Sequence, residues 1–136
     1  MLIIYNYKMR HKCKIRKFSR DPKHRKAMLR NLVTNLMQHQ RITTTLERAK
    51  EMRPFVERLI RRAKGKDYQG NVVLKQNLFS KDAISNVKNI MVPRFENQPA
   101  GFTRVKYLGL RQNDRANMAY IEIIGNEIET YEKNEF

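Results

Sequence analysis

The chain has 136 residues, the length of one compact domain with one hydrophobic core. Its 29 Lys and Arg against 13 Asp and Glu give a net charge of +16. Such an excess predicts a nucleic-acid partner, because so many cations repel one another unless phosphates neutralise them. The single cysteine excludes an internal disulfide, and no apolar run approaches the roughly 20 residues of a membrane span. The opening MLIIY is too short for the apolar core of a signal peptide, so we expect no removed presequence.

The first part of the chain, residues 1–20, is predicted to form an extension and a basic arm outside the folded domain. Residues 1–8 are mostly apolar and aromatic, whereas a charge stands at nearly every second position from Arg10 to Arg20. The arm has neither a helical nor a strand apolar period. It needs a partner of opposite charge, and phosphate is the anion we expect. Because it lacks an apolar period it should add nothing to the core, and the domain should fold without it.

The first helix is predicted from Pro22 to about Gln40. Proline suits the first helical turn, and Asp21 or Ser19 can cap the free N–H groups there. The N-terminal half is basic, although the helix macrodipole favours acids at this end, so we expect these cations to bind an external anion. An apolar residue recurs every third or fourth position and marks the buried stripe: Met28, Leu29, Leu32, Val33, Leu36 and Met37.

A short β-branched strand at 41–44 precedes a second helix that starts at Leu46 and stops near Gly65. Pro54 lies inside this helix and is predicted to kink it. Glu57 and Arg61 are spaced for an attractive pair on the helix surface. The outer face of the helix is strongly basic and carries Arg48, Lys50, Arg53, Arg58, Arg61, Arg62 and Lys64.

The remaining elements are shorter and lie between glycine and proline punctuation. We predict a loop at 65–71, helices at 72–79 and 81–91, a loop at 92–101, and strands at 102–109 and 117–124. The last two strands should pair as an antiparallel hairpin. The whole predicts an α+β fold, a single globular domain at 21–125 with a small three-stranded sheet packed by about four helices on one side. The acidic tail, 126–136, shows no clear period.

The sequence contains little evidence for other classes of function. The soft metal ligands are His11, Cys13, His24 and His39, and they show no CxxC or HxxxH spacing. Cys13 lies in an arm without a predicted pocket, and the acids that a nuclease would need are scattered. No helix-turn-helix, zinc-finger or RNA-recognition pattern is present. We therefore expect no catalysis, no metal, no cofactor and no small-molecule substrate, but binding to a nucleic-acid backbone of fixed shape.

An ordered series of residues resembles the family of protein seventeen of the bacterial-type large ribosomal subunit. The similarity covers about residues 9–124. It comprises Met9-Arg10-His11, His24-Arg25, Met28, Arg30-Asn31, His39, Ile42-Thr43-Thr44, Ala49-Lys50-Glu51, Glu57, Leu59-Ile60, Ala63-Lys64, Pro93-Arg94-Phe95, Gly101-Phe102-Thr103-Arg104-Val105, Arg111, Asp114 and Met118-Ala119-Tyr120-Ile121-Glu122. Gln98 departs from the family, which usually has Arg before its Gly-Gly-Tyr. The resemblance implies an α/β fold and an rRNA-binding structural protein near the polypeptide exit region.

The function predicted from residues and resemblance together is that of a structural constituent of the large ribosomal subunit. Its partners would be large-subunit rRNA and neighbouring ribosomal proteins. The strongest candidates for rRNA contact are Arg10, His11, Lys12, Lys14, Arg16, Lys17, Arg20, His24 and Arg25; Arg30, Arg94, Arg104 and Arg111 come second. Phe18 could stack on an unpaired base or anchor the arm on the core. The alternative is a free-standing basic protein that compacts DNA or RNA.

The extension ahead of Met9 favours an organellar ribosome, in the mitochondrial matrix, over one in the bacterial cytoplasm or another organelle.

Overall fold

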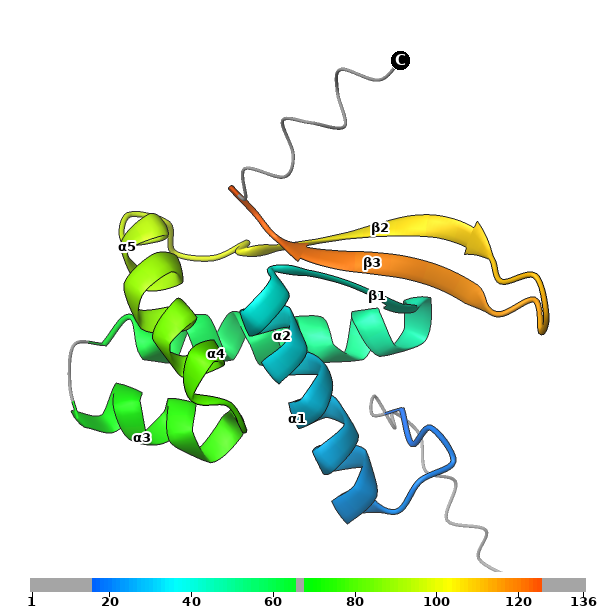
Figure 1. Cartoon of the computed structure of the whole chain (residues 1–136), viewed down its shortest axis with the longest axis horizontal. Helices are drawn as coiled ribbons and strands as arrows, with labels where there is room; N and C mark the ends of the chain where they lie inside the picture. Colours follow the sequence, from blue (N-terminus) through cyan, green and yellow to red (C-terminus); the bar gives the residue numbers. More distant parts are fainter. Residues whose placement is uncertain (1–15, 66–67, 126–136) are drawn as a thin grey trace, which may run out of the picture.

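The structure, a computed structural model, describes residues 16–65 and 68–125 (Figure 1). In chain order the elements are α1 (Pro22–His39), β1 (Arg41–Thr45), α2 (Leu46–Ala63), α3 (Tyr68–Asn77), α4 (Lys81–Asn86), the π-helical turn η1 (Val87–Met91), α5 (Val92–Arg94), β2 (Thr103–Leu110) and β3 (Asn117–Ile123). Because α4, η1 and α5 follow one another without a break, they form one helical segment. The α+β class with a small sheet and about four helices is confirmed.

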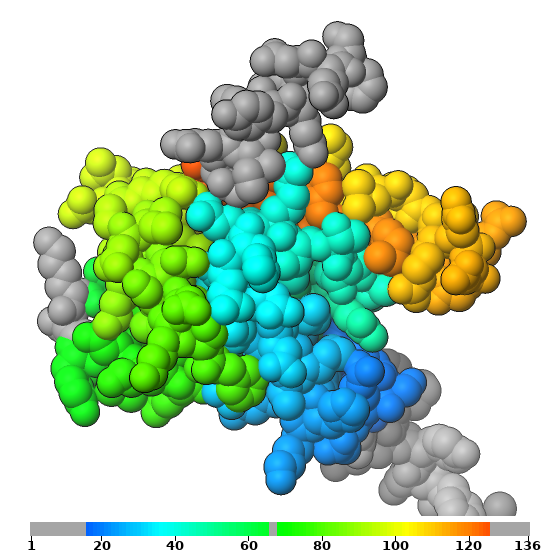
Figure 2. All heavy atoms as spheres, viewed as in Figure 1, coloured from blue at the N-terminus to red at the C-terminus, as the bar shows by residue number. Residues whose placement is uncertain are grey.

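The sheet has the strand order β1-β3-β2, and both pairings are antiparallel. The predicted hairpin is formed by β2 and β3, and β1 pairs with the other edge of β3, so that Thr43 and Lys106 both lie opposite Tyr120. The register of β2 shifts between Tyr107 and Gly109, which marks a β-bulge. The hairpin extends past the helices, and its tip projects from the body of the molecule (Figures 1 and 2).

The core lies between the sheet and the helices, which gather on one side of it (Figure 1). Alternate residues of β3, namely Ala119, Ile121 and Ile123, are fully buried. They meet the apolar stripes of α1 and α2, which are buried at Val33, Leu36, Met37, Ala49, Met52, Val56 and Ile60. The predicted stripe of α1 is thus confirmed in its C-terminal half, whereas Met28, Leu29 and Leu32 are only half-buried.

Two helix boundaries differ from the prediction. α3 starts at Tyr68 rather than at residue 72, and Gly70 lies within it. A Cβ on Gly70 would come within 2.7 Å of the Gly65 carbonyl oxygen, so the glycine permits close packing on the end of α2 rather than marking a loop. The last helical segment continues through Pro93 to Arg94 rather than ending at residue 91.

Glu57 fastens the start of β2 to α2. Its carboxylate accepts hydrogen bonds from the backbone N–H groups of Gly101 at 3.1 Å and Thr103 at 3.0 Å, and from the Thr103 hydroxyl at 2.8 Å. The surface pair of Glu57 with Arg61 that the spacing predicted is absent from the ion pairs of the described residues. The carboxylate is instead committed to the chain segment that leads into the sheet.

Replacing this carboxylate should therefore loosen the junction of helix and sheet. We expect Glu57→Ala to lower the free energy of unfolding by about 1.5–3 kcal/mol, because the variant can no longer form hydrogen bonds to a charged acceptor. Glu57→Gln keeps one acceptor oxygen and should cost less. Urea denaturation followed by circular dichroism measures both variants. Equal stability of Glu57→Ala and the unchanged chain would contradict this role.

Candidate nucleic-acid interface

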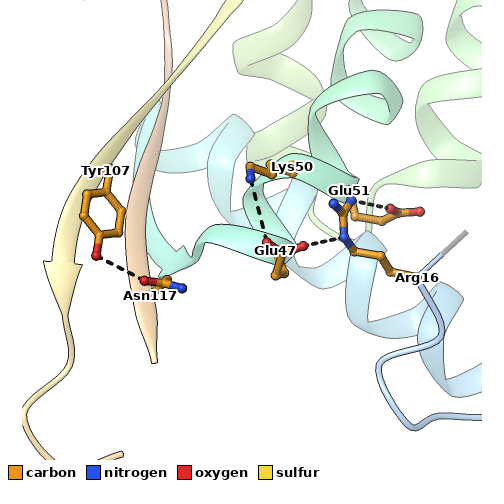
Figure 3. A network of polar contacts seen from close by, with 6 residues as sticks. All are labelled: Arg16, Glu47, Lys50, Glu51, Tyr107 and Asn117. Carbon is orange, nitrogen blue, oxygen red and sulfur yellow. Dashed lines mark hydrogen bonds and ion pairs between the residues drawn. The ribbon is translucent and has the colours of Figure 1, made fainter. Parts of the chain in front are cut away.

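The described end of the basic arm lies against the first turns of α2. Arg16 Nε is 2.5 Å from a carboxylate oxygen of Glu47, and its Nη1 atom is 3.3 Å from a carboxylate oxygen of Glu51 (Figure 3). Arg20 contacts the Met28 sulfur on α1. The core includes none of residues 16–20, as expected of the arm, but these surface contacts between arm and domain were not predicted. Arg16 therefore serves to hold the arm at the start of α2.

A tight turn leads from this contact into α1. Phe18 and Ser19 have φ values of 56° and 52°, in the left-handed region that residues other than glycine rarely adopt. Asp21 then caps α1, accepting a hydrogen bond from the His24 backbone N–H at 3.3 Å, as one of the two predicted caps. Phe18 is half-buried. The turn thus places the described end of the arm between the start of α1 and the start of α2.

Three of the strongest candidates, Lys17, His24 and Arg25, surround this turn. Lys17 and His24 are exposed and Arg25 is half-buried. None of the three side chains makes an ion pair or hydrogen bond within the described residues. The first turn of α1 also contains no acid. These basic side chains are therefore available to an external anion, while Arg10, His11, Lys12 and Lys14 lie outside the described residues.

The four second-rank candidates all interact within the chain. The Arg30 guanidinium lies 4.0 Å from the centre of the Phe79 ring, and Arg94 donates to the Gln40 side-chain oxygen at 3.0 Å. Arg104 is 3.6 Å from Glu122, and Arg111 forms a bidentate pair with Asp114 at 2.9 and 2.6 Å. Hydrogen bonds from Arg111 hold the pKa of Asp114 well below its usual range. Each of these arginines is thus held in place by its own chain.

The sheet face turned away from the core carries a second group of charged residues, which we did not predict from the sequence. Arg41 donates to Glu122 at 2.9 Å and lies 4.5 Å from the centre of the Tyr120 ring, while Lys106 lies 5.8 Å from the same ring. Glu122 is only 2% exposed. The alternation of residues along the three strands indicates which side chains share a face of the sheet. It predicts that Arg41 and Glu122 lie together only if the pairing register of their strands is known, and the two residues are 81 positions apart in the sequence.

Gln98, which departs from the family pattern, stabilises a turn. Its side-chain amide donates to the carbonyl oxygens of Ala100 at 3.0 Å and Gly101 at 2.8 Å, and Gly101 has a φ of 80°. Lys64 donates to the Gln98 backbone carbonyl at 2.6 Å. This position therefore shapes the entry into β2.

The described residues contain neither a metal-binding cluster nor a helix that could span a membrane. Within residues 16–65 and 68–125, no group of three or more His, Cys, Asp or Glu could hold a metal ion. No helix in those ranges is long and apolar enough to cross a membrane.

Comparison with known proteins decides the family. The family model described as ribosomal protein L17 matches residues 28–124. The chain belongs to the ribosomal protein L17 family. A large ribosomal subunit protein bL17 of Ehrlichia canis (strain Jake) is 44% identical over 132 residues, which cover 93% of this chain and 98% of that protein. The bL17 proteins of Rickettsia africae (strain ESF-5) and Rickettsia bellii (strain OSU 85-389) are each 40% identical, over 88% of this chain and 88% and 84% of their own lengths. The resemblance in the sequence is thereby confirmed.

Proposed function

We propose that the chain is a non-enzymatic structural constituent of the large ribosomal subunit that binds rRNA through its backbone phosphates. The observation that carries the proposal is the cluster of basic residues at the start of α1 that have no partner among the described residues, in a chain with a net charge of +16 and membership of the L17 family. The names of the relatives place those proteins in the large subunit. Charge, fold and family therefore point to the same partner.

The start of α1 is suited to hold a phosphate. The free N–H groups at a helix N-terminus and the positive end of the macrodipole attract anions. Here the basic residues Lys23, His24, Arg25 and Lys26 stand where acids would normally be favoured, and Asp21 satisfies only one N–H group. A phosphate beside Lys17, His24 and Arg25 would relieve this repulsion. The basic arm, with Arg10, His11, Lys12, Lys14 and Arg20, would continue along the same RNA segment.

The paired arginines would contribute differently. Arg16, Arg30, Arg94, Arg104 and Arg111 are each held by a partner in the chain, so their positions are set before RNA binds. A guanidinium group has five N–H donors and keeps some of them for a phosphate after one pair has formed. Pre-positioned donors lose little conformational entropy on binding. These residues would therefore add shape selectivity to the charge of the arm.

The place of the protein within the subunit rests on the resemblance alone, which implies the polypeptide exit region, and we extend the proposal to that region. The mitochondrial location remains a prediction from the extension ahead of Met9, and the relatives named above are bacterial. The alternative, a free-standing compacting protein, would share the same basic surface.

A charge-matched comparison tests the arm. Filter binding to large-subunit rRNA at several salt concentrations measures the affinity of the variant Lys12→Gln, Lys14→Gln, Lys17→Gln. We expect its slope of log affinity against log salt to be less steep by about 0.7–0.9 for each phosphate that is no longer neutralised. The matched control, Lys75→Gln, Lys81→Gln, Lys88→Gln, removes the same charge from exposed positions of α3, α4 and η1. The control should keep a slope close to that of the unchanged chain. Equal changes in both variants would contradict a specific role for the arm.

A further inference from the structure

The outer face of α2 carries four exposed arginines without a partner in the described residues: Arg53, Arg58, Arg61 and Arg62. We call these four residues the α2 arginine face. The acid nearest to them in sequence, Glu57, accepts three hydrogen bonds from Gly101 and Thr103. Its carboxylate is therefore turned to the junction with the sheet and is not available to neutralise the arginines.

Helix geometry brings these charges close together. Arg58 is three positions from Arg61 and four from Arg62, spacings at which side chains on a helix meet and like charges repel. The C-terminal end of the macrodipole favours cations, which lets the helix tolerate them but supplies no counter-ion. Three guanidinium groups thus lie within little more than one helical turn, and no acid among the described residues pairs with them. They can therefore bind an external anion.

The surface around the α2 arginine face is hollowed on two sides. A hollow of about 410 Å³ is lined by Arg53, Pro54, Glu57, Arg58, Arg61 and Ala100. A second, of about 210 Å³, lies between α2 and α3 and is lined by Phe55, Arg58, Leu59, Arg62, Val73 and Asn77. Arg58 borders both. Guanidinium forks beside shallow, partly apolar hollows suit a polynucleotide, whose phosphates take the charge while its sugars and bases fill the hollows.

This face is separate from the attachment of the arm. Arg16 binds Glu47 and Glu51 in the first turns of α2, whereas Arg58, Arg61 and Arg62 lie in its C-terminal half, where α3 packs (Figure 1), and Arg53 lies between the two. At 1.5 Å per residue, Glu51 and Arg62 are about 16 Å apart along the helix. The attachment of the arm and the cluster of Arg58, Arg61 and Arg62 therefore lie toward opposite ends of α2, and the two acids are at the end nearer the arm.

We propose that the α2 arginine face is a second RNA-backbone site, which binds an RNA segment other than the one bound by the arm. The protein then ties two rRNA segments together through α2. This inference rests on the proposed function, because it assumes that the partner of the chain is rRNA. An acidic protein is the other partner that such a surface could take, and the hollows beside the guanidinium groups favour RNA.

The test uses the full chain and large-subunit rRNA of the source organism. In the variant Arg58→Gln, Arg61→Gln, Arg62→Gln, we expect the salt slope to fall by about 0.7–0.9 for each phosphate released, against no comparable change in the control Lys75→Gln, Lys81→Gln, Lys88→Gln. Circular dichroism checks that both variants keep the fold. A variant that binds like its control would overturn the second site while leaving the function of the arm intact. Absence of salt-dependent binding by the unchanged chain would instead overturn the proposed function, and the second site with it.

Hydroxyl-radical footprinting of the same rRNA then separates one surface from two. Removal of the arm charges (Lys12→Gln, Lys14→Gln, Lys17→Gln) and removal of the α2 arginine charges should each abolish protection of a different set of nucleotides. If both variants leave the same nucleotides unprotected, the two surfaces bind one segment and the proposed bridge is wrong.

Discussion

Raising the salt concentration from 50 to 200 mM should weaken binding of the chain to large-subunit rRNA by about 10³–10⁵-fold. A decrease of this size follows if six to ten phosphates are neutralised, since each neutralised phosphate releases condensed counterions whose return becomes favourable in concentrated salt. The basic groups required are present: Lys17, His24 and Arg25 have no side-chain partner among the described residues, and the arm contributes several more.

Filter binding across a salt series measures this effect directly. A response that stays nearly flat over the same range would contradict phosphate neutralisation as the source of affinity. Cys13→Ser serves as a control, because the thiol has no part in a phosphate mechanism. Its binding and salt slope should match those of the unchanged chain.

Truncating Leu36 should have the largest effect on folding. Its side chain on α1 is 0% exposed, and we expect Leu36→Ala to lower the free energy of unfolding by about 2–5 kcal/mol through reduced apolar burial and the cavity left behind. That is a large share of the 5–15 kcal/mol typical of a whole domain. Leu32→Ala, four residues earlier on the same helix, is the matched control; Leu32 is half-buried, so its truncation should cost less.

Urea denaturation distinguishes the two leucine variants, and the midpoint should move without a change in the slope of unfolding. If Leu32→Ala lowers the free energy of unfolding as much as Leu36→Ala does, the core is not centred on the residues that are fully buried in the structure. Leu36→Ala should lose rRNA binding only as far as it unfolds. The arm variant should show the reverse, with weakened binding and an unchanged midpoint, because none of residues 16–20 belongs to the core.

Most of the architecture could be predicted from local patterns. The apolar stripe of α1, the start and stop signals of α2 and the two strand segments of the final hairpin place these elements to within a residue or two of their observed bounds. The predictions failed where one residue type has two uses. Gly70 is typical of a loop but permits helix packing here, and Pro93 is typical of a helix end although the helical segment continues through it to Arg94.

The basic composition of the candidate interface could be predicted from the sequence, but the arrangement of its side chains could not. Density of charge identified the arm, yet no local pattern shows that Arg16 binds Glu47 and Glu51, because 35 positions separate it from Glu51. The same limit applies to Glu57, whose spacing suggested Arg61 but whose partners lie 44 and 46 positions away. Only the tertiary fold shows which arginines are already paired and which remain available, and this difference separates the α2 arginine face from Arg104 and Arg111.

Sedimentation of the ribosomes of the source organism tests the central claim most directly. The account predicts that the chain, followed with an antibody through a sucrose gradient, co-migrates with the large subunit, both in free subunits and in assembled ribosomes. Disruption of the subunits by removal of rRNA should release it. A chain that remains at the top of the gradient while large subunits are intact would contradict the account and favour the free-standing nucleic-acid-compacting protein.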